Sequence, residues 1–337
     1  MNIGSSILIL AKIGKFLLTR VTSLSENVVA LAGGVGGAKL ALGFASVLPP
    51  EELKLIVNTG DDDIFHGLYV CPDIDTVMYT LADLSNTDTG WGLADESFKA
   101  LSMLDRYGCD TWFNLGDLDF GTHIMRKCLL DDNYTLTETT AYLCRKLGIS
   151  THVLPMTNDR ISTVIKTVGG DLSMQQYFVR DKAEPEVLDI TYVGSDTAQP
   201  SEEFSEALDN ADKLVFCPSN PFLSIGPILA LDGIRSKMMA LKKDNHHRIA
   251  VSPIVSGDSV KGPAGKIMRE LGYEVSCVTV AELYRDLCDV FVIDVSDSKH
   301  CKAIQALGIN PLVAPIIMNS KADKINLAKT LLELDVT

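Results

Sequence analysis

Short apolar runs, each long enough for one buried strand, recur along this chain and alternate with stretches of helical periodicity. Such alternation is typical of a mostly parallel sheet with helices on both faces. The predicted strands cover residues 27–31, 53–57, 152–156, 162–165, 213–217, 248–252 and 289–293, and the predicted helices cover residues 39–47, 76–82, 98–104, 122–130 and 137–147. We therefore predict the α/β class, with a Rossmann-like, mostly parallel sheet.

Two segments depart from this alternation. Residues 91–148 are mainly helical, so we expect a small helical subdomain inserted into one α/β domain of residues 27–337. In the first 26 residues, Lys12 and Lys15 interrupt the apolar stretch, which is unlike a secretory signal or a membrane span. We predict that residues 1–26 are an extension, and we assign no function to it.

Charge and cysteine content limit the class of function. The 337 residues carry a net charge of −14, which argues against a general nucleic-acid surface because such a surface needs a basic stripe. The eight cysteines form no C-x-x-C pair, as expected for reduced thiols of a cytoplasmic protein. We expect a cytoplasmic protein whose partners are small molecules, and neither nucleic acid nor a membrane.

Five aspartates follow the predicted strand at residues 53–57. Asp61, Asp62, Asp63, Asp73 and Asp75 would lie beyond its carboxyl end, where open α/β sheets bind ligands. Hard oxygen ligands in this place indicate Mg²⁺ and a phosphorylated substrate. The three consecutive side chains diverge, so one or two of them would converge with Asp73 or Asp75. The structural alternative is that Asp73 and Asp75 cap a helix.

A glycine-rich segment, residues 33–37, joins the first predicted strand to the first predicted helix. Backbone N–H groups at such a helix start can bind phosphate. The glycine spacing matches neither the dinucleotide fingerprint nor a Walker loop, and Asn58 stands where a nicotinamide enzyme usually carries an acid. A tight turn that needs small residues is the structural alternative. The nucleotide- or phosphate-binding candidates here are Gly33, Gly34, Gly36, Gly37, Lys39 and Asn58.

Two later loops also follow predicted strands. Residues 218–227 combine three prolines with serines and indicate a rigid loop rich in hydrogen-bond donors; its candidates are Ser219, Asn220, Ser224 and Gly226. After the strand at residues 248–252, Lys261 and Lys266 could meet phosphates. His123 is a lone histidine, for which a structural role is the commoner one.

At these loops the sequence resembles the 2-phospho-L-lactate transferase family, the CofD-like proteins that are called FbiA in actinobacteria and make the precursor of the deazaflavin coenzyme F-420. The resemblance runs from about residue 28 to the C-terminus. Its motifs occur in the family's order at residues 32–39, 58–62, 66–67, 72–76, 115–117, 122–123, 154–156 and 218–227.

The resemblance implies a magnesium-dependent phosphotransferase for substituted phosphate groups, expected as a homodimer. Its donor would be lactyl-2-diphospho-5′-guanosine or the enolpyruvyl or glyceryl counterpart. Its acceptor would be the 5′-hydroxyl of 7,8-didemethyl-8-hydroxy-5-deazariboflavin (FO), giving F-420-0 or its dehydro form and GMP.

The resemblance also implies roles for individual residues. Asp61 and Asp73 would hold the metal, and Asp75 and Asn114 would contact the deazaflavin. At the position of Asn114 the residue varies within the family and is often basic, so Asn114 departs from the usual residue. Asp75 would orient the attacking hydroxyl or accept its proton, with Asp62 as the other candidate for the catalytic role.

Two other functions fit parts of the sequence. Relatives of the gluconeogenesis-factor type share the fold and look like non-catalytic, nucleotide-sugar-binding regulators, but residues 72–75 together with Trp91 and Gly92 favour the enzyme. A nicotinamide oxidoreductase is disfavoured by the glycine spacing and by Asn58.

Overall fold

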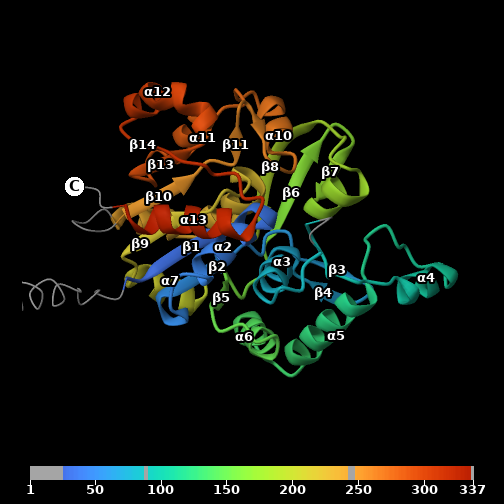
Figure 1. Cartoon of the computed structure of the whole chain (residues 1–337). Helices are drawn as coiled ribbons and strands as arrows, with labels where there is room; N and C mark the ends of the chain where they lie inside the picture. Colours follow the sequence, from blue (N-terminus) through green and yellow to red (C-terminus); the bar gives the residue numbers. More distant parts are fainter. Residues whose placement is uncertain (1–25, 87–89, 242–246, 335–337) are drawn as a thin grey trace, which may run out of the picture.

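A parallel seven-stranded sheet forms the centre of the computed structural model, which describes residues 26–86, 90–241 and 247–334 (Figure 1). Every adjacent pair of its strands is parallel. In spatial order the strands are β14 (Asn310–Val313), β13 (Val290–Ile293), β10 (His247–Val251), β9 (Lys213–Phe216), β1 (Val28–Ala32), β2 (Leu53–Val57) and β5 (His152–Pro155). The predicted fold class is confirmed. The extension predicted at residues 1–26 lies, apart from Glu26, outside the described residues.

The strands are apolar throughout because both faces of the sheet are covered. All five residues of β1 are buried. Val28, Ala30 and Ala32 face one core, whereas Val29 and Leu31 face the other. This alternation of successive side chains divides the interior into two hydrophobic layers.

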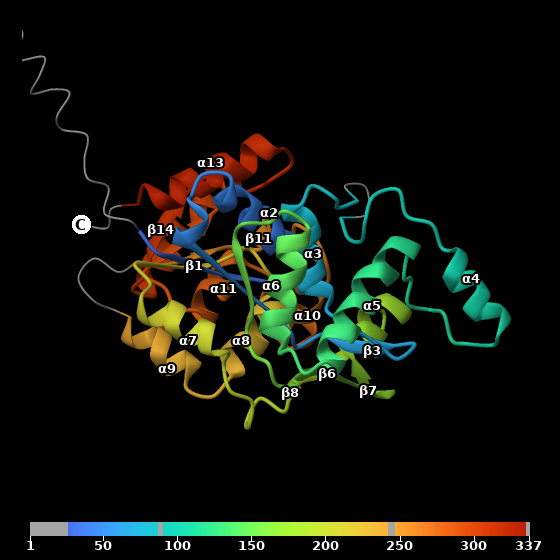
Figure 2. The same ribbon diagram turned by 90° about the horizontal axis from the view of Figure 1, so that it is seen from below.

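Helices cover both faces, as predicted (Figure 2). One face carries α2 (Gly34–Ala45), α3 (Pro72–Leu81), α6 (Leu136–Lys146) and α13 (Lys321–Leu332). The other face carries α7 (Glu202–Asp209), α8 (Gly226–Ala230), α9 (Ile234–Ala240), α10 (Ala264–Glu270), α11 (Cys277–Leu283) and α12 (Cys301–Ala306). Within the described residues, no helix combines the length and the apolar character that crossing a bilayer requires.

Three helices follow one another between α3 and β5. They are α4 (Lys99–Arg106), α5 (Asp117–Asp131) and α6. A capping box between Thr135 and Glu138 starts α6, which packs on the core. By contrast, Leu101 is the one buried residue of α4, which projects from the body of the protein (Figure 1).

The strand predicted at residues 162–165 exists, but the prediction that it belongs to the parallel sheet is wrong. β6 (Ser162–Thr167) pairs antiparallel with β7 (Gly170–Ser173) and β8 (Val187–Val193) in a separate sheet. Its residues alternate between half-buried and buried, which is typical of a sheet with one covered face. Two short hairpins complete the β-structure: β3 (Asp63–Phe65) with β4 (Leu68–Val70), and β11 (Ile254–Val255) with β12 (Asp258–Ser259).

Two segments predicted as loops are helical instead. The glycine-rich segment is the first turn of α2, which begins at Gly34 and not near residue 39. The proline-rich segment contains a π-helical turn, η3 (Pro221–Ile225), that runs into α8. Three other turns are η1 (Pro50–Glu52), η2 (Gln176–Arg180) and η4 (Val295–His300). Prolines at the first helical positions suit such starts, since their missing N–H would lack a partner there anyway.

Candidate active site

The predicted site lies where three adjacent strands of the main sheet end. β2 lies on one side of β1 and β9 on the other. Gly33 follows β1, Asn58 follows β2 and Cys217 follows β9. Open α/β sheets bind ligands in the crevice beyond the carboxyl ends of strands, at the point where the strand order reverses.

Asn58 joins the segments that meet at this edge. It is fully buried, and its Nδ2 donates to Asp61 Oδ1 at 2.9 Å, to Asp73 Oδ2 at 3.0 Å and to the Leu223 carbonyl at 3.3 Å. Its Oδ1 accepts the Gly60 N–H at 2.8 Å. One side chain thereby holds two carboxylates from different elements against each other.

Asp73 also connects two helix starts. It lies in the first turn of α3, and its Oδ1 accepts the Gly34 N–H, from the first turn of α2, at 2.6 Å. The N-terminal ends of helices carry partial positive charge, so two helices stabilise negative charge at this point. The alternative that Asp73 serves only as a first-turn acid of α3 does not account for its bonds to Asn58 and Gly34.

Asp61 and Asp73 are buried, like-charged neighbours. Burial, followed by the charges of Asp73 and Asp62, raises the pKa of Asp61 well above its ordinary value. Burial also raises the pKa of Asp73 to about 6, although hydrogen bonds from Asn58 and Gly34 oppose the shift. No Lys, Arg or His forms an ion pair with either carboxylate within residues 26–86, 90–241 and 247–334. Two converging carboxylates without a cationic partner fit a hard divalent cation such as Mg²⁺.

We expect Mg²⁺ affinity to fall steeply below pH 6. Metal binding requires ionised ligands, and the pKa of Asp73 is about 6 in the metal-free protein, so protons compete with the ion below that pH. Because the pKa of Asp61 is raised as well, the Kd should rise at least about tenfold per pH unit as the pH falls below about 6. Titration calorimetry with MgCl₂ alone, from about pH 5 to about pH 8, measures this profile. A Kd that stays constant over the range would contradict it.

The first two glycines leave space for Asp73. A Cβ on Gly33 would lie 2.5 Å from Asp73 Oδ2 and 2.5 Å from the Ser224 Cβ. Gly34 has a φ of 61°, a left-handed conformation that glycine adopts without strain, and this turns its N–H toward Asp73. Both positions therefore serve the acid cluster directly.

The next two glycines allow the β9 loop to pack on α2. A Cβ on Gly36 would clash with the Pro218 carbonyl, and one on Gly37 would lie 2.8 Å from Ser219 Oγ. Ser219 Oγ donates to the Gly33 carbonyl at 2.8 Å and accepts the Gly33 N–H at 3.2 Å. Gly36 and Gly37 are therefore needed for the close approach of the β9 loop, which differs from the tight turn expected as the structural alternative, and Ser219 links the two loops.

The remaining candidates after β9 also have structural partners. Asn220 caps η3, because its Oδ1 accepts the N–H groups of Phe222 at 2.9 Å and Leu223 at 3.1 Å. A Cβ on Gly226 would clash with the Tyr192 hydroxyl. Ser224 is buried beside Gly33. Nucleotide contact by Ser219, Asn220, Ser224 and Gly226 stays a prediction.

Lys39 lies in the second turn of α2, and two other lysines are close enough to affect its pKa. Burial, followed by the charges of Lys261 and Lys324, lowers the pKa of Lys39, so an anion bound among these side chains would relieve their repulsion. Lys266, the other lysine expected to meet phosphates, is instead engaged within the protein. Its Nζ lies 2.6 Å from the Glu270 carboxylate, so that prediction is wrong.

Asp75 is paired with Arg126, a fully buried residue of α5. Arg126 Nη1 donates to Asp75 Oδ2 at 3.1 Å, and Nη2 forms a short ion pair with Oδ1. Although burial alone would lower it, the Asp75 charge holds the pKa of Arg126 above its ordinary value. Both oxygens of Asp75 are engaged in this way, which disfavours it as a proton acceptor.

Asp62 also lies on the Arg126 side of the cluster. Burial raises its pKa well above the ordinary value, against opposing effects of Cys71 and Arg126. Neither of its buried oxygens has a hydrogen-bond partner of good geometry in the described part of the chain. Asp63 is partly exposed and lies 3.8 Å from Arg160. The expected divergence of the three consecutive carboxylates is therefore present in the structure.

His123 extends the buried network along α5. Its Nδ1 lies 3.1 Å from Arg126 Nη1, and its Nε2 lies 3.2 Å from Asp119 Oδ2. A guanidinium can only donate, so Nδ1 accepts and the ring proton is on Nε2, facing Asp119. The Tyr79 hydroxyl donates to Asp119 Oδ1 at 2.6 Å. Although burial opposes it, His123 and Tyr79 hold the pKa of Asp119 below its ordinary value.

A pocket of about 280 Å³ lies between the chain leading to α4 and the start of α5. Asn114, the second predicted deazaflavin residue, lines it together with Asn86, Trp91, Gly92, Leu93, Asp95, Glu96, Phe98, Gly116 and Asp119. Because Asp119 contacts His123 and His123 contacts Arg126, a continuous polar network connects this pocket to Asp75. Asn114 and Asp75 therefore belong to one connected region.

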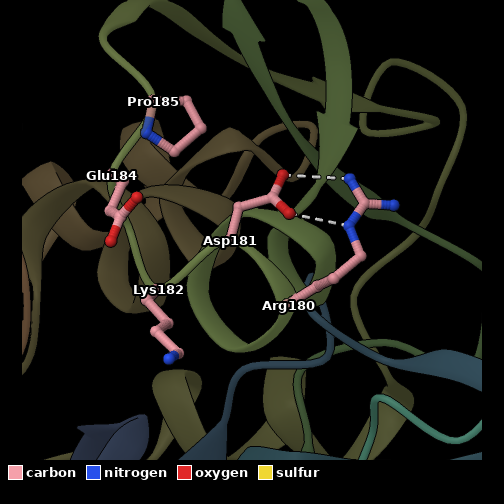
Figure 3. A pocket seen from close by; sticks show the side chains of 5 residues that line it. All are labelled: Arg180, Asp181, Lys182, Glu184 and Pro185. Atoms are coloured by element: carbon pink, nitrogen blue, oxygen red, sulfur yellow. Dashed lines mark hydrogen bonds and ion pairs between the residues drawn. The ribbon is translucent and has the colours of Figure 1, made fainter.

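A wider hollow of about 630 Å³ lies on the turn after η2 (Figure 3). Arg180, Asp181, Lys182, Glu184 and Pro185 line it, and none of them is a predicted site residue. Arg180 pairs with Asp181 through hydrogen bonds of 2.8 and 2.9 Å, so much of its charge is already neutralised. We assign this hollow no part in the site.

Sequence patterns did not single out Arg126, Asp119 and Tyr79 as site residues. The first two were detectable, because Asp119, His123 and Arg126 follow the i, i+4, i+7 spacing of one helix face. Arg126 at a core-facing position should have indicated a buried acidic partner, since an unpaired buried charge is very costly.

Comparisons with known proteins show the family from the sequence and the fold from a solved structure. A family model described as 2-phospho-L-lactate transferase CofD matches residues 28–320. A 2-phospho-L-lactate transferase of Methanocaldococcus jannaschii is 40% identical over 310 residues, covering 91% of this chain and 97% of the relative. A phosphoenolpyruvate transferase of Kitasatospora aureofaciens is 39% identical over 315 residues, with the same two coverages. A crystal structure of a UPF0052 family member from Bacillus halodurans matches with a TM-score of 0.59 at 17% identity, covering 91% of this chain and 99% of that one, which shows a shared fold.

Proposed function

Since the chain belongs to the CofD family of 2-phospho-L-lactate transferases, we propose that it transfers a phospholactyl, phosphoenolpyruvyl or phosphoglyceryl group to FO. The donor is the matching guanylylated diphosphate, such as lactyl-2-diphospho-5′-guanosine. The ribityl 5′-oxygen of FO forms a bond to the phosphorus that carries the acid, and the bond from that phosphorus to GMP breaks. The products are F-420-0, or its dehydro form, and GMP.

One observation carries this proposal: Asn58 holds Asp61 and Asp73 together at the carboxyl edge of the sheet. A structural pair of buried acids would be expected to have a cationic side chain as partner, and none pairs with them within the described residues. Mg²⁺ bound by Asp61 and Asp73 would neutralise charge on the diphosphate oxygens of the donor. Phosphoryl transfer depends mainly on such charge stabilisation and on positioning.

We assign the anionic donor to the start of α2. This helix end carries partial positive charge, and Lys39 in the second turn, together with Lys261, adds the charge of two cationic groups. Their mutual repulsion falls when an anion binds between them. The packing of Gly36 and Gly37 against the β9 loop would keep this helix start fixed relative to Asn58.

We assign the deazaflavin to the pocket that contains Asn114. Trp91 and Phe98 line it with partly exposed aromatic rings, which suit a planar tricyclic ligand, and Asn114 offers amide donors and acceptors. Asp75 would act here through Arg126 and His123, as a positioning residue for the ribityl chain. Arg126 forms hydrogen bonds to Asp75 but not to Asp62, whose oxygens have no hydrogen-bond partner of good geometry within the described residues. Of the two predicted catalytic acids, Asp62 is therefore the better candidate to accept the proton of the attacking 5′-hydroxyl.

We also propose a cytoplasmic homodimer. The free cysteines, of which none forms a disulfide within the described residues, fit a reducing compartment. Exposed apolar side chains on and beside the projecting α4, including Met103 and Tyr107, fit a subunit contact.

A turnover assay tests the proposed reaction. The purified protein is incubated with FO, MgCl₂ and each of the three guanylylated donors, and mass spectrometry identifies the products. We expect GMP and an FO derivative heavier by the phosphoacyl group, with one donor preferred. FO and donor that bind without release of GMP would overturn the proposal and favour the regulator alternative.

A further inference from the structure

A second group of metal-binding residue types lies outside this site, in the C-terminal half of the sheet. Cys277 Sγ, a carboxylate oxygen of Asp297 and a ring nitrogen of His300 all lie within 4.8 Å of one another. Cys277 begins α11, and the other two belong to η4, which follows β13. α11 packs on the face of the sheet opposite the one that carries α3.

The three donor atoms approach one another without bonding. No hydrogen bond or ion pair joins any two of these residues in the parts of the chain that the structure describes. Asp297 is only 3% exposed and accepts the Ser256 N–H at 2.9 Å, and no cationic side chain pairs with it among the described residues. A buried carboxylate without a counter-charge is costly, and coordination of a metal ion is one of the usual solutions.

The spacing suits a small tetrahedral ion after a modest contraction. Zn²⁺ binds sulfur at about 2.3 Å and nitrogen or oxygen at about 2.0–2.2 Å, so ligand atoms of one tetrahedral ion lie roughly 3.3–3.8 Å apart. Side-chain rotations that bring the atoms about 1 Å closer would complete the site. A thiolate, an imidazole and a carboxylate form a set that favours zinc over magnesium.

We propose that Cys277, Asp297 and His300 bind one Zn²⁺ ion, separate from the Asp61–Asp73 pair. Cys277 and Asp297 are buried, whereas His300 is partly exposed, so the ion can enter on the His300 side and a water molecule can complete its coordination. Binding converts the Cys277 thiol to the thiolate, and one proton leaves to solvent. The ion ties α11 to η4, so its contribution is to the stability of this half of the sheet.

Cobalt gives a direct readout, because a thiolate bound to Co²⁺ produces a charge-transfer band that carboxylate sites lack. The full-length protein is stripped of metal and titrated with CoCl₂ alone. We expect a near-ultraviolet band and visible absorption typical of tetrahedral Co²⁺, saturating at one ion per chain and abolished by added ZnCl₂. A folded wild-type protein that takes up Co²⁺ without this band would overturn the proposal.

Two matched variants test whether Cys277 is the thiolate ligand. Cys277→Ser should lose the band, whereas Cys288→Ser, which removes a buried thiol of the same core outside the group, should keep it. A band that survives in Cys277→Ser would contradict the assignment. If Cys277→Ser does not fold, His300→Ala at a partly exposed position replaces it. This variant should bind Zn²⁺ at least about tenfold more weakly, and unchanged affinity would be an equally clear refutation.

Discussion

Replacing Asp61 by asparagine should abolish turnover and, at the same time, make the metal-free protein more stable. The substitution removes one of the two carboxylates that would hold Mg²⁺. A catalytic metal contributes several kcal/mol to the transition state, so we expect kcat to fall by about 10³-fold or more. The hydrogen bond from Asn58 survives, because the new amide oxygen in Asp61→Asn can still accept it.

The gain in stability has an electrostatic cause. Burial and the charges of Asp73 and Asp62 raise the pKa of Asp61, so its ionised form is unfavourable in the folded protein above its ordinary pKa. Without metal, Asp61→Asn should raise the free energy of unfolding at neutral pH by on the order of 1 kcal/mol, or roughly 2 °C in Tm. The difference should shrink as the pH falls and Asp61 of the wild type becomes protonated.

Differential scanning fluorimetry with and without MgCl₂ measures the stability effect, and the turnover assay measures the catalytic one. Asp63→Asn is the matched control, because this neighbouring acid is partly exposed and lies near Arg160. It should leave both quantities nearly unchanged. If Asp61→Asn destabilises the metal-free protein, or responds to Mg²⁺ as the wild type does, Asp61 is not part of the metal pair.

Replacing Arg126 by methionine should destabilise the protein by about 3–5 kcal/mol, because it leaves the Asp75 carboxylate buried without its partner. Arg126 also contacts His123 and the Tyr69 carbonyl, so one substitution removes bonds to three other residues. Urea unfolding followed by circular dichroism gives the change in midpoint and slope.

The neighbouring residue supplies the control. Lys127 pairs with Asp131 at 2.9 Å on the exposed face of the same helix, and Lys127→Met should cost below about 0.5 kcal/mol. Adding Asp75→Asn to Arg126→Met should restore much of the lost stability, since both charges are then absent. If the double variant is no more stable than Arg126→Met, the ion pair does not explain the loss.

Most of the fold could be predicted from local patterns, because a fully buried strand must be a continuous apolar run. Residues 27–31 and 213–217 were predicted as strands on this ground and lie side by side as β1 and β9. β6 was assigned to the wrong sheet because the strands with which a segment pairs cannot be read from its own sequence. Its one covered face carries Thr163 and Thr167 as well as Ile165, unlike the wholly apolar strand β1 of the main sheet. β14 was missed because it is a four-residue edge strand that contains Pro311.

The part of the site that is formed by residues close together in the sequence could be predicted. Asn58, Asp61 and Asp73 are at most 15 positions apart, and their convergence follows from a strand end and the next helix start. The close contact of Gly36 with the Pro218 carbonyl depends on which strand lies beside β1, which no local pattern reveals. For this reason the sequence did not reveal that Gly36 and Gly37 are needed for packing against the β9 loop, and nucleotide or phosphate binding by the glycines stays a prediction.

The bonds around Asn58 also determine when the site can form during synthesis. Its contact with the Leu223 carbonyl spans 165 positions, and the Gly33–Ser219 contact spans 186. The ribosome therefore releases β1, β2 and the aspartates that follow β2 long before it releases the segment after β9 that completes the site. Closing so long a loop is entropically unfavourable and slow. Asp61 and Asp73 therefore remain without the segment after β9 until that segment has been made and has folded against them. We expect a nascent chain that ends before β9 to bind no metal at Asp61 and Asp73, because the site is complete only after the segment following β9 has been translated.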